Sequence, residues 1–233
     1  MRSLLGILAF IFAMTLAPAG AALAHGGGSS GSSGMVTATP RSGGDAAKSA
    51  YNAGVRTIKK AQDYDAESAK ASTPEKAAKA HEKAQKAYHD SLGSFIDAVG
   101  ADPKMYDAWN YLGFANRHLG NYEDALSSYA KALEINPNYP NAIEYRGEAY
   151  LGLNQIEDAK GAYMALFSVS RPLADELMVA MHHWADARRQ DSQGLPSADV
   201  EAFTKWMDER ASVAAQTASL AIGAAQPWRP GQR

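Results

Sequence analysis

Two neighbouring histidines, His182 and His183, are the residues whose types and spacing come nearest to metal chemistry. Asp186 follows His182 by four positions, so both side chains would share one face of a helix, a spacing that metal sites use. A metal site also needs a third ligand, and adjacent residues of a helix point about 100° apart. We therefore expect a structural or surface role for this pair. A metal-binding or metal-dependent protein that uses exposed His25, His118 and His182 is kept as the alternative function.

Other signatures of catalysis or cofactor binding are missing from the sequence. The 233 residues include no cysteine, which excludes disulfides, a thiolate nucleophile and cysteine-ligated zinc. No glycine-rich phosphate loop follows a predicted strand, and neither a Gly-x-Ser-x-Gly elbow nor a His-Glu-x-x-His pair occurs. The 23 basic residues against 25 acidic ones give no bulk charge for binding nucleic acid. We predict a protein that is not an enzyme, needs no cofactor or metal ion, and does not bind nucleic acid.

A lysine-rich run from Lys70 to His89 is the other charged feature. It places five lysines against two glutamates, a pattern that anionic lipid or nucleic acid could attract. Alanine rather than large apolar residues separates the lysines, which argues against insertion into a membrane. A solvated helix face is the favoured interpretation.

The start of the chain has the pattern of a cleavable signal peptide. Arg2 precedes the apolar residues 4–16, and Ala22-Leu23-Ala24 provides the small-x-small pattern that signal peptidase reads. Ala19-Gly20-Ala21 is a second candidate cleavage site. The alternative is an uncleaved membrane anchor, because residues 4–23 are just long enough, at roughly 20 residues, to cross a bilayer.

The expected signal peptide spans residues 1–24, and cleavage after Ala24 predicts a periplasmic or secreted protein that does not associate with the membrane. Residues 25–44 are rich in Gly and Ser and predict a flexible linker. Residues 223–233 predict a disordered tail. The alanine-rich sequence between linker and tail favours helices over strands. We therefore expect one helical domain over residues 45–222.

Residues 106–139 predict a pair of helices. Large and small side chains recur there at i, i+3, i+4 and i+7, the spacings that place residues on one face of a helix. Gly120-Asn121 provides a C-cap and a turn, and Pro137 ends the second helix. Gly113 and Ala125 lack bulk where the helices would cross, so their axes can approach closely. The segment therefore predicts a helix hairpin.

This unit resembles the tetratricopeptide repeat, whose pattern holds aromatic, small and proline residues at fixed offsets. Only Asn116 departs from the pattern, since it replaces an aromatic residue. The residues at the other family positions are Trp109, Leu112, Gly113, Gly120, Tyr122, Ala125, Tyr129, Ala132 and Pro137.

A shift by one repeat length tests the resemblance and reveals a degenerate repeat over residues 140–173, in which Arg146 replaces the leucine. The residues on its family positions are Gly147, Tyr150, Ala159 and Tyr163. The opposite shift gives an atypical repeat with an elongated helix pair over residues 45–105, and residues 173–222 predict capping helices. We predict an all-α fold: a short tetratricopeptide-like α-solenoid of antiparallel helix hairpins with a C-terminal capping helix.

The resemblance implies that the first helices of the repeats line a concave groove in which a partner binds. The groove positions of the two repeats fall on Asp107, Asn110, Phe114, Arg117, His118, Asn141, Glu144, Glu148 and Leu151, and a weak third unit would add Asp175, Met178 and His182. Carboxylates, an aromatic ring and basic groups together suit a peptide with basic and apolar side chains. Some family members clamp a peptide's terminal carboxylate with Lys and Asn. We expect no such clamp here, because Asn110 has no lysine companion and Glu144 and Glu148 would repel a carboxylate.

The combined prediction is an exported, periplasmic adaptor or scaffold that binds a partner protein or peptide in its concave groove. The metal-binding alternative stands beside it, and a structural protein that self-associates is a third hypothesis. The sequence leaves the identity of the partner open.

Overall fold

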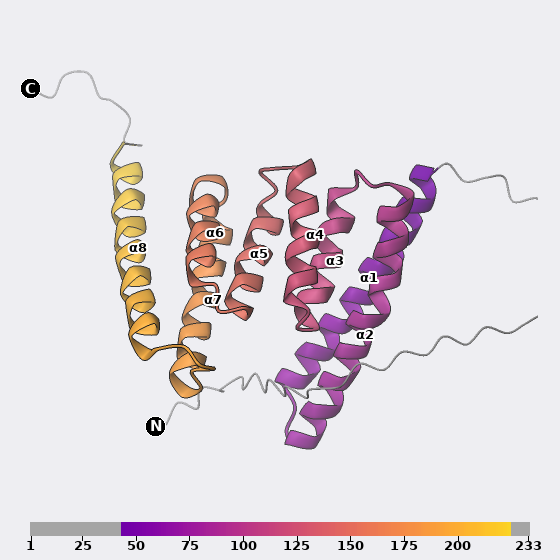
Figure 1. The fold of residues 1–233 in the computed structure, drawn as a ribbon, viewed down its shortest axis with the longest axis horizontal. Coiled ribbons are helices and arrows are strands. Elements are labelled where there is room, and N and C mark those ends of the chain that lie inside the picture. The colour runs from indigo at the N-terminus through magenta and orange to yellow at the C-terminus, as the bar shows by residue number, and fades with distance from the viewer. Residues whose placement is uncertain (1–42, 225–233) are drawn as a thin grey trace, which may run out of the picture.

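The computed structural model describes residues 43–224 and, within them, the side chains of residues 44–217. This part of the chain forms eight α-helices and no strand, and the helices follow one another in a row as antiparallel neighbours (Figure 1). Their bounds are α1 (Gly43–Ala69), α2 (Pro74–Ala101), α3 (Tyr106–His118), α4 (Tyr122–Ile135), α5 (Pro140–Gly152), α6 (Ile156–Val169), α7 (Arg171–Gln190) and α8 (Ser197–Ala224). The predicted all-α solenoid is confirmed. The expected signal peptide, residues 25–42 of the expected linker and residues 225–233 of the expected tail lie outside the described residues.

Proline and capping residues set where several helices begin. Thr73 is the N-cap of α2, and its side chain accepts a hydrogen bond from the Lys76 backbone N–H at 3.3 Å. Pro74 follows at the first helical position, where a missing N–H costs nothing. Pro140 begins α5 in the same way. These local signals separate consecutive helices that the alanine content alone would let run on.

The first hairpin is about twice as long as the two that follow. Helices α1 and α2 contain 27 and 28 residues, whereas α3 to α6 contain 13 or 14. The long pair nevertheless uses the packing of the matched repeat. A Cβ atom at Gly54 would lie 2.6 Å from the Phe95 ring, and one at Gly113 would lie 2.6 Å from the Tyr129 ring. In both hairpins a glycine of the first helix therefore receives an aromatic ring of the second.

Equivalent turns join the helices of the two central hairpins. Gly120 has φ 79°, and Asn154, at the same position of the next repeat, has φ 59°. Asparagine tolerates the left-handed region better than other residues with a Cβ, so it replaces glycine at the same turn. The degenerate repeat thus keeps the backbone of the clear one.

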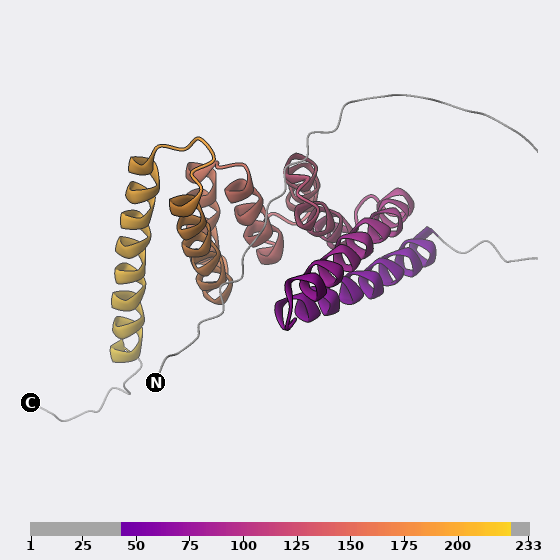
Figure 2. The same cartoon turned by 90° about the horizontal axis from the view of Figure 1, so that it is seen from below.

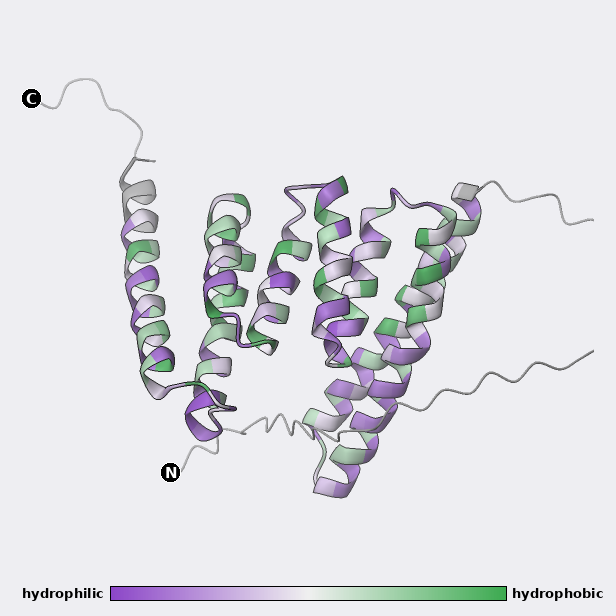
Figure 3. Ribbon diagram, in the orientation of Figure 1, coloured by the Kyte–Doolittle hydropathy of each residue, from purple (hydrophilic) through white to green (hydrophobic). Residues whose placement is uncertain are grey.

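Helix α8 covers the far end of the row (Figure 2). Val200, Phe203 and Met207 are buried and pack in the same core cluster as α6 and α7. The Trp206 ring contacts the Tyr163 ring edge-on at 5.5 Å between centroids. Along α8 and the other helices, polar and apolar residues alternate (Figure 3), and no described helix is long and apolar enough to cross a membrane.

Candidate functional site

The first helices of successive repeats, α3, α5 and α7, are neighbours in the structure. Contacts between α3 and α5 define their register. Tyr139, just before α5, is hydrogen-bonded to Asp107, and further along the Phe114 and Tyr145 rings meet at 5.0 Å between centroids. One turn later, Arg117 forms an ion pair with Glu148. The sequence separation is nearly the same in each pair, so the two helices run side by side in the same direction.

The predicted groove residues are less exposed than a free groove would require. Asn110, Phe114, Glu144, Leu151 and Met178 are buried, and Asn110 and Glu144 expose only 1% and 3% of their surface. The partly exposed predicted residues are Asp107, Arg117, His118, Asn141, Glu148 and His182, while Asp175 is exposed. Polar groups on this face are therefore held inside packed helices, with partly exposed polar residues around them.

Arg117 is the charged centre of this face. Its guanidinium pairs with Glu148 and lies over the rings of Phe114, at 5.3 Å, and Tyr145, at 5.2 Å. Burial alone would lower the pKa of Arg117, but Glu148 together with the weaker effects of Tyr129 and Glu144 outweighs burial and raises it. The cation is thus fixed between a carboxylate and two aromatic faces.

Glu144 lies one turn before Glu148 on α5 and is a buried carboxyl group. Burial, then the charge of Glu148 and a hydrogen bond with it, raise the pKa of Glu144 from 4.5 to about 9. Glu176 of α7 contributes in the same direction, and Arg117 opposes it. At neutral pH, Glu144 is therefore protonated and donates its proton to a hydrogen bond with Glu148.

Asn110 is the other buried polar group of this face. Its Oδ1 atom has no hydrogen-bond partner among the described residues. A buried acceptor without a donor costs free energy. The register of α3 and α5 places Asn110 opposite the turn of α5 that carries Asn141 and Glu144.

His118 is only partly exposed, and most of its ring packs against other side chains. Its ring stacks on Tyr88 at 4.3 Å and contacts Phe114 at 4.4 Å between centroids. Nε2 lies 3.4 Å from an Arg117 nitrogen, and burial followed by the Arg117 charge places the pKa of His118 well below 6.5. This neutral imidazole packs α3 against α2, which leaves it only partly exposed.

The remaining candidate for metal chemistry is the segment around His182. Asp186 forms an ion pair with Arg189, and His183 is exposed. Within residues 43–224, no three His, Asp or Glu side chains gather as metal ligands. His25 lies outside the described residues.

Several residues of the site were not predicted from the sequence. Tyr145 flanks Arg117, Glu176 approaches Glu144, and Tyr88 covers His118 and donates a hydrogen bond to Asp65 at 2.6 Å. A shift by two repeat lengths from Asp107 indicates Asp175, the position just before Glu176. The signal for Tyr88 was available, because it stands one repeat length before Tyr122, which closes over Gly152 in the next repeat.

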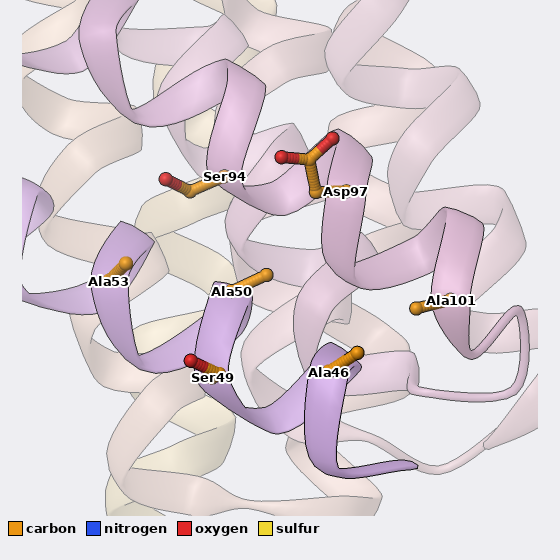
Figure 4. A pocket seen from close by; sticks show the side chains of 7 residues that line it. All are labelled: Ala46, Ser49, Ala50, Ala53, Ser94, Asp97 and Ala101. Carbon is orange, nitrogen blue, oxygen red and sulfur yellow. The ribbon is translucent and has the colours of Figure 1, made fainter. Parts of the chain in front are cut away.

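Two shallow depressions lie between α1 and α2. One, of about 390 Å³, is lined by small residues and one carboxylate (Figure 4), namely Ala46, Ser49, Ala50, Ala53, Ser94, Asp97 and Ala101. The other, of about 290 Å³, is lined by Thr57, Lys60, Tyr64, Lys83, Lys86, Ala87 and Asp90. No residue of α3, α5 or α7 lines either depression.

Comparison with known proteins identifies the central hairpin. The family model described as tetratricopeptide repeat matches residues 106–139, which are α3, α4 and the turn after them. The repeat predicted there is confirmed. No curated protein sequence matches the chain.

Two solved structures are similar to the chain. One is the first tetratricopeptide domain of Spaghetti (RPAP3) bound to the HSP90 peptide SRMEEVD, with 19% identity and a TM-score of 0.46 over 61% of this chain and 95% of that one. The other is the MamA protein, with 21% identity and a TM-score of 0.40 over 74% of this chain and 96% of that one.

Proposed function

We propose that the protein is an exported adaptor that binds a partner protein, or a segment of one, along the face shared by α3, α5 and α7. The observation that carries the proposal is the set of polar residues on this face. Arg117, Glu144 and Glu148 form a charged cluster between α3 and α5, whereas glycine and aromatic residues pack the two helices of each hairpin together. Burying charged groups is costly even when they are paired, and replacing such a pair by apolar residues is often neutral or stabilising, so the cluster suggests a role beyond stability.

The chemistry of this face favours a peptide with basic and apolar side chains. Asp107 and Glu148 offer partly exposed carboxylates, and Tyr145, which packs on the buried Phe114, offers a partly exposed aromatic ring. An extended or helical segment is recognised in this way by apolar contacts together with a few fixed polar groups. The structure gives no comparable support to the metal-binding alternative within residues 43–224.

Export is proposed from residues 1–24 and has its own test. Fractionation of cells followed by N-terminal sequencing should find the mature chain outside the cytoplasm, beginning at His25. A start at residue 22 would indicate the second cleavage site. An intact N-terminus in the membrane fraction would replace export of a free adaptor by a membrane-anchored protein.

Photo-crosslinking in intact cells tests where the partner binds. A photoreactive amino acid is placed at Asp107 or Asn141 on the proposed face, or at Lys131 or Glu134 on the exposed face of α4. We expect a crosslinked partner from the first two positions and none from the other two. The same partner from α4 alone would refute binding along α3, α5 and α7, and a second copy of this chain as the partner would make the protein a self-assembling scaffold.

A further inference from the structure

We propose that the partner inserts one lysine or arginine side chain beside Glu144, between α3, α5 and α7. This inference rests on the proposed function and assigns the chemistry of its central contact. The contact concerns a cationic side chain of the partner.

Carboxyl groups outnumber cations around Glu144. Glu148 of α5 and Glu176 of α7 both act on Glu144, and Arg117 of α3 is the cation that faces it. The Arg117 guanidinium already pairs with Glu148. Three carboxyl groups therefore share one cation, and the imbalance is met in the free protein by a proton on Glu144. A second cation would complete the cluster.

Asn110 of α3 carries a buried oxygen without a hydrogen-bond donor among the described residues. Asn110 is 1% exposed, and its Oδ1 accepts no hydrogen bond from the described residues. Asp107–Tyr139 on one side of it and Phe114–Tyr145 on the other place Asn110 opposite the turn of α5 that carries Glu144. An ammonium or guanidinium group supplies several N–H donors, enough for this oxygen and the Glu144 carboxylate together. A carboxylate or an apolar side chain would leave Asn110 unpaired.

The aromatic rings of Phe114 and Tyr145 lie on the same face. Tyr145 lies near Glu144, whose charge contributes to the raised pKa of Tyr145, about 12, after the larger effect of burial. Tyr145 and Phe114 already hold one guanidinium on their faces. Aromatic walls accept the methylene stem of a lysine or arginine while its charged end reaches the carboxylate.

Insertion of the cation displaces a proton. Neutral Glu144 loses its proton to solvent, gives up the hydrogen bond that it donated to Glu148, and becomes the carboxylate that pairs with the incoming ammonium or guanidinium. The groups that face Glu144 are Arg117 on α3, Tyr145 and Glu148 on α5, and Glu176 on α7. Binding through this contact therefore tightens as pH rises, by up to about tenfold per pH unit if one proton is released.

Two pools of short random peptides test the proposal. One central position is fixed as lysine in the first pool and as norleucine, a neutral residue of similar shape, in the second. Retention of each pool by the immobilised chain of residues 25–233 is measured at pH 6 and pH 8 for the unmodified chain, for Glu144→Gln and for Glu201→Gln. Gln has the shape of a protonated Glu, and Glu201 lies exposed on α8, so it serves as the matched control.

The expected result is a preference for the lysine pool of about tenfold or more, the size of a charge-assisted hydrogen bond. This preference should increase from pH 6 to pH 8. Glu144→Gln should reduce it to near one and remove its pH dependence, and Glu201→Gln should change neither. Thermal melts followed by circular dichroism establish that both variants fold.

Each other outcome overturns the proposal in a distinguishable way. Equal retention of both pools by the unmodified chain would refute the cationic contact and leave the peptide-binding face standing. A lysine preference unchanged in Glu144→Gln would place the cation elsewhere. Retention of neither pool would contradict the proposed function itself, and this inference with it.

Discussion

Replacing Glu144 by glutamine should stabilise the free protein, and more so as pH rises. The carboxyl group is 3% exposed, and burial together with Glu148 raises its pKa from 4.5 to about 9. The folded state therefore binds a proton that the unfolded state releases above pH 4.5. Stability is then greatest below the unfolded pKa and declines as pH rises toward 9. Glutamine occupies the same volume, donates a similar hydrogen bond to Glu148 and does not titrate.

The size of the effect follows from the pKa. Each pH unit between the unfolded and folded pKa costs about 1.4 kcal/mol. Between 4.5 and neutral pH the cost reaches about 3 kcal/mol, which sets the upper limit of the gain from Glu144→Gln at pH 7. At pH 5 the variant and the unmodified protein should differ by less than about 1 kcal/mol.

Urea unfolding at pH 5, 7 and 8.5, followed by circular dichroism, measures this difference. The gap between the free energies of unfolding of Glu144→Gln and the unmodified protein should widen steadily over this range. The exposed control Glu201→Gln should show no such trend. A gap that stays constant from pH 5 to pH 8.5, or a variant that loses stability relative to the unmodified protein as pH rises, would show that Glu144 is ionised in the folded protein. Either result would refute the account of this cluster.

Three further predictions concern a partly buried histidine, two glycines and a turn. His118→Phe should keep the ring stack but remove a loss of stability at acid pH. The folded protein resists protonating His118, so the contribution of this residue to the free energy of unfolding is complete above pH 6.5 and is lost as pH falls below it. Urea unfolding at pH 7 and pH 5 measures this loss in the unmodified protein and in the variant. Gly113→Ala places a methyl group 2.6 Å from the Tyr129 ring and should cost about 1–3 kcal/mol, whereas Gly161→Ala, with open space around it, should gain about 1 kcal/mol, and thermal melts compare the two. Asn154→Ala should cost about 1 kcal/mol more than Asn154→Gly, because the turn needs φ 59° and both variants lose the same amide; equal melting temperatures would contradict this.

The hairpin at residues 106–139 could be predicted because its packing is local. Gly113 and Tyr129 belong to the two helices of one hairpin and meet within it, so their spacing in the sequence determines their contact. The fold class followed from repeating this unit. Contacts between hairpins are less accessible to such reasoning, because they depend on how each repeat is rotated against the next.

The candidate site illustrates this limit. The family pattern placed Glu144 and Glu148 on one face of a helix, but the approach of Glu176 depends on where α7 begins relative to α5. The repeat shift placed Asp175 at a groove position, whereas the residue that acts on Glu144 is Glu176, one position later. His118 was expected to be exposed, but the ring of Tyr88 on the long α2 stacks on it and leaves it only partly exposed. Burial, and the pKa of a group that follows from burial, emerge only when neighbouring hairpins are packed together.

Hydrogen exchange with and without the captured partner is the most direct test of binding along α3, α5 and α7. Amides of these three helices should gain protection when the partner recovered by crosslinking is added to the purified chain of residues 25–233. Amides of α4 and the outer half of α8 should exchange at unchanged rates. Protection confined to the α1–α2 pair or to α4, with α3, α5 and α7 unaffected, would contradict the account.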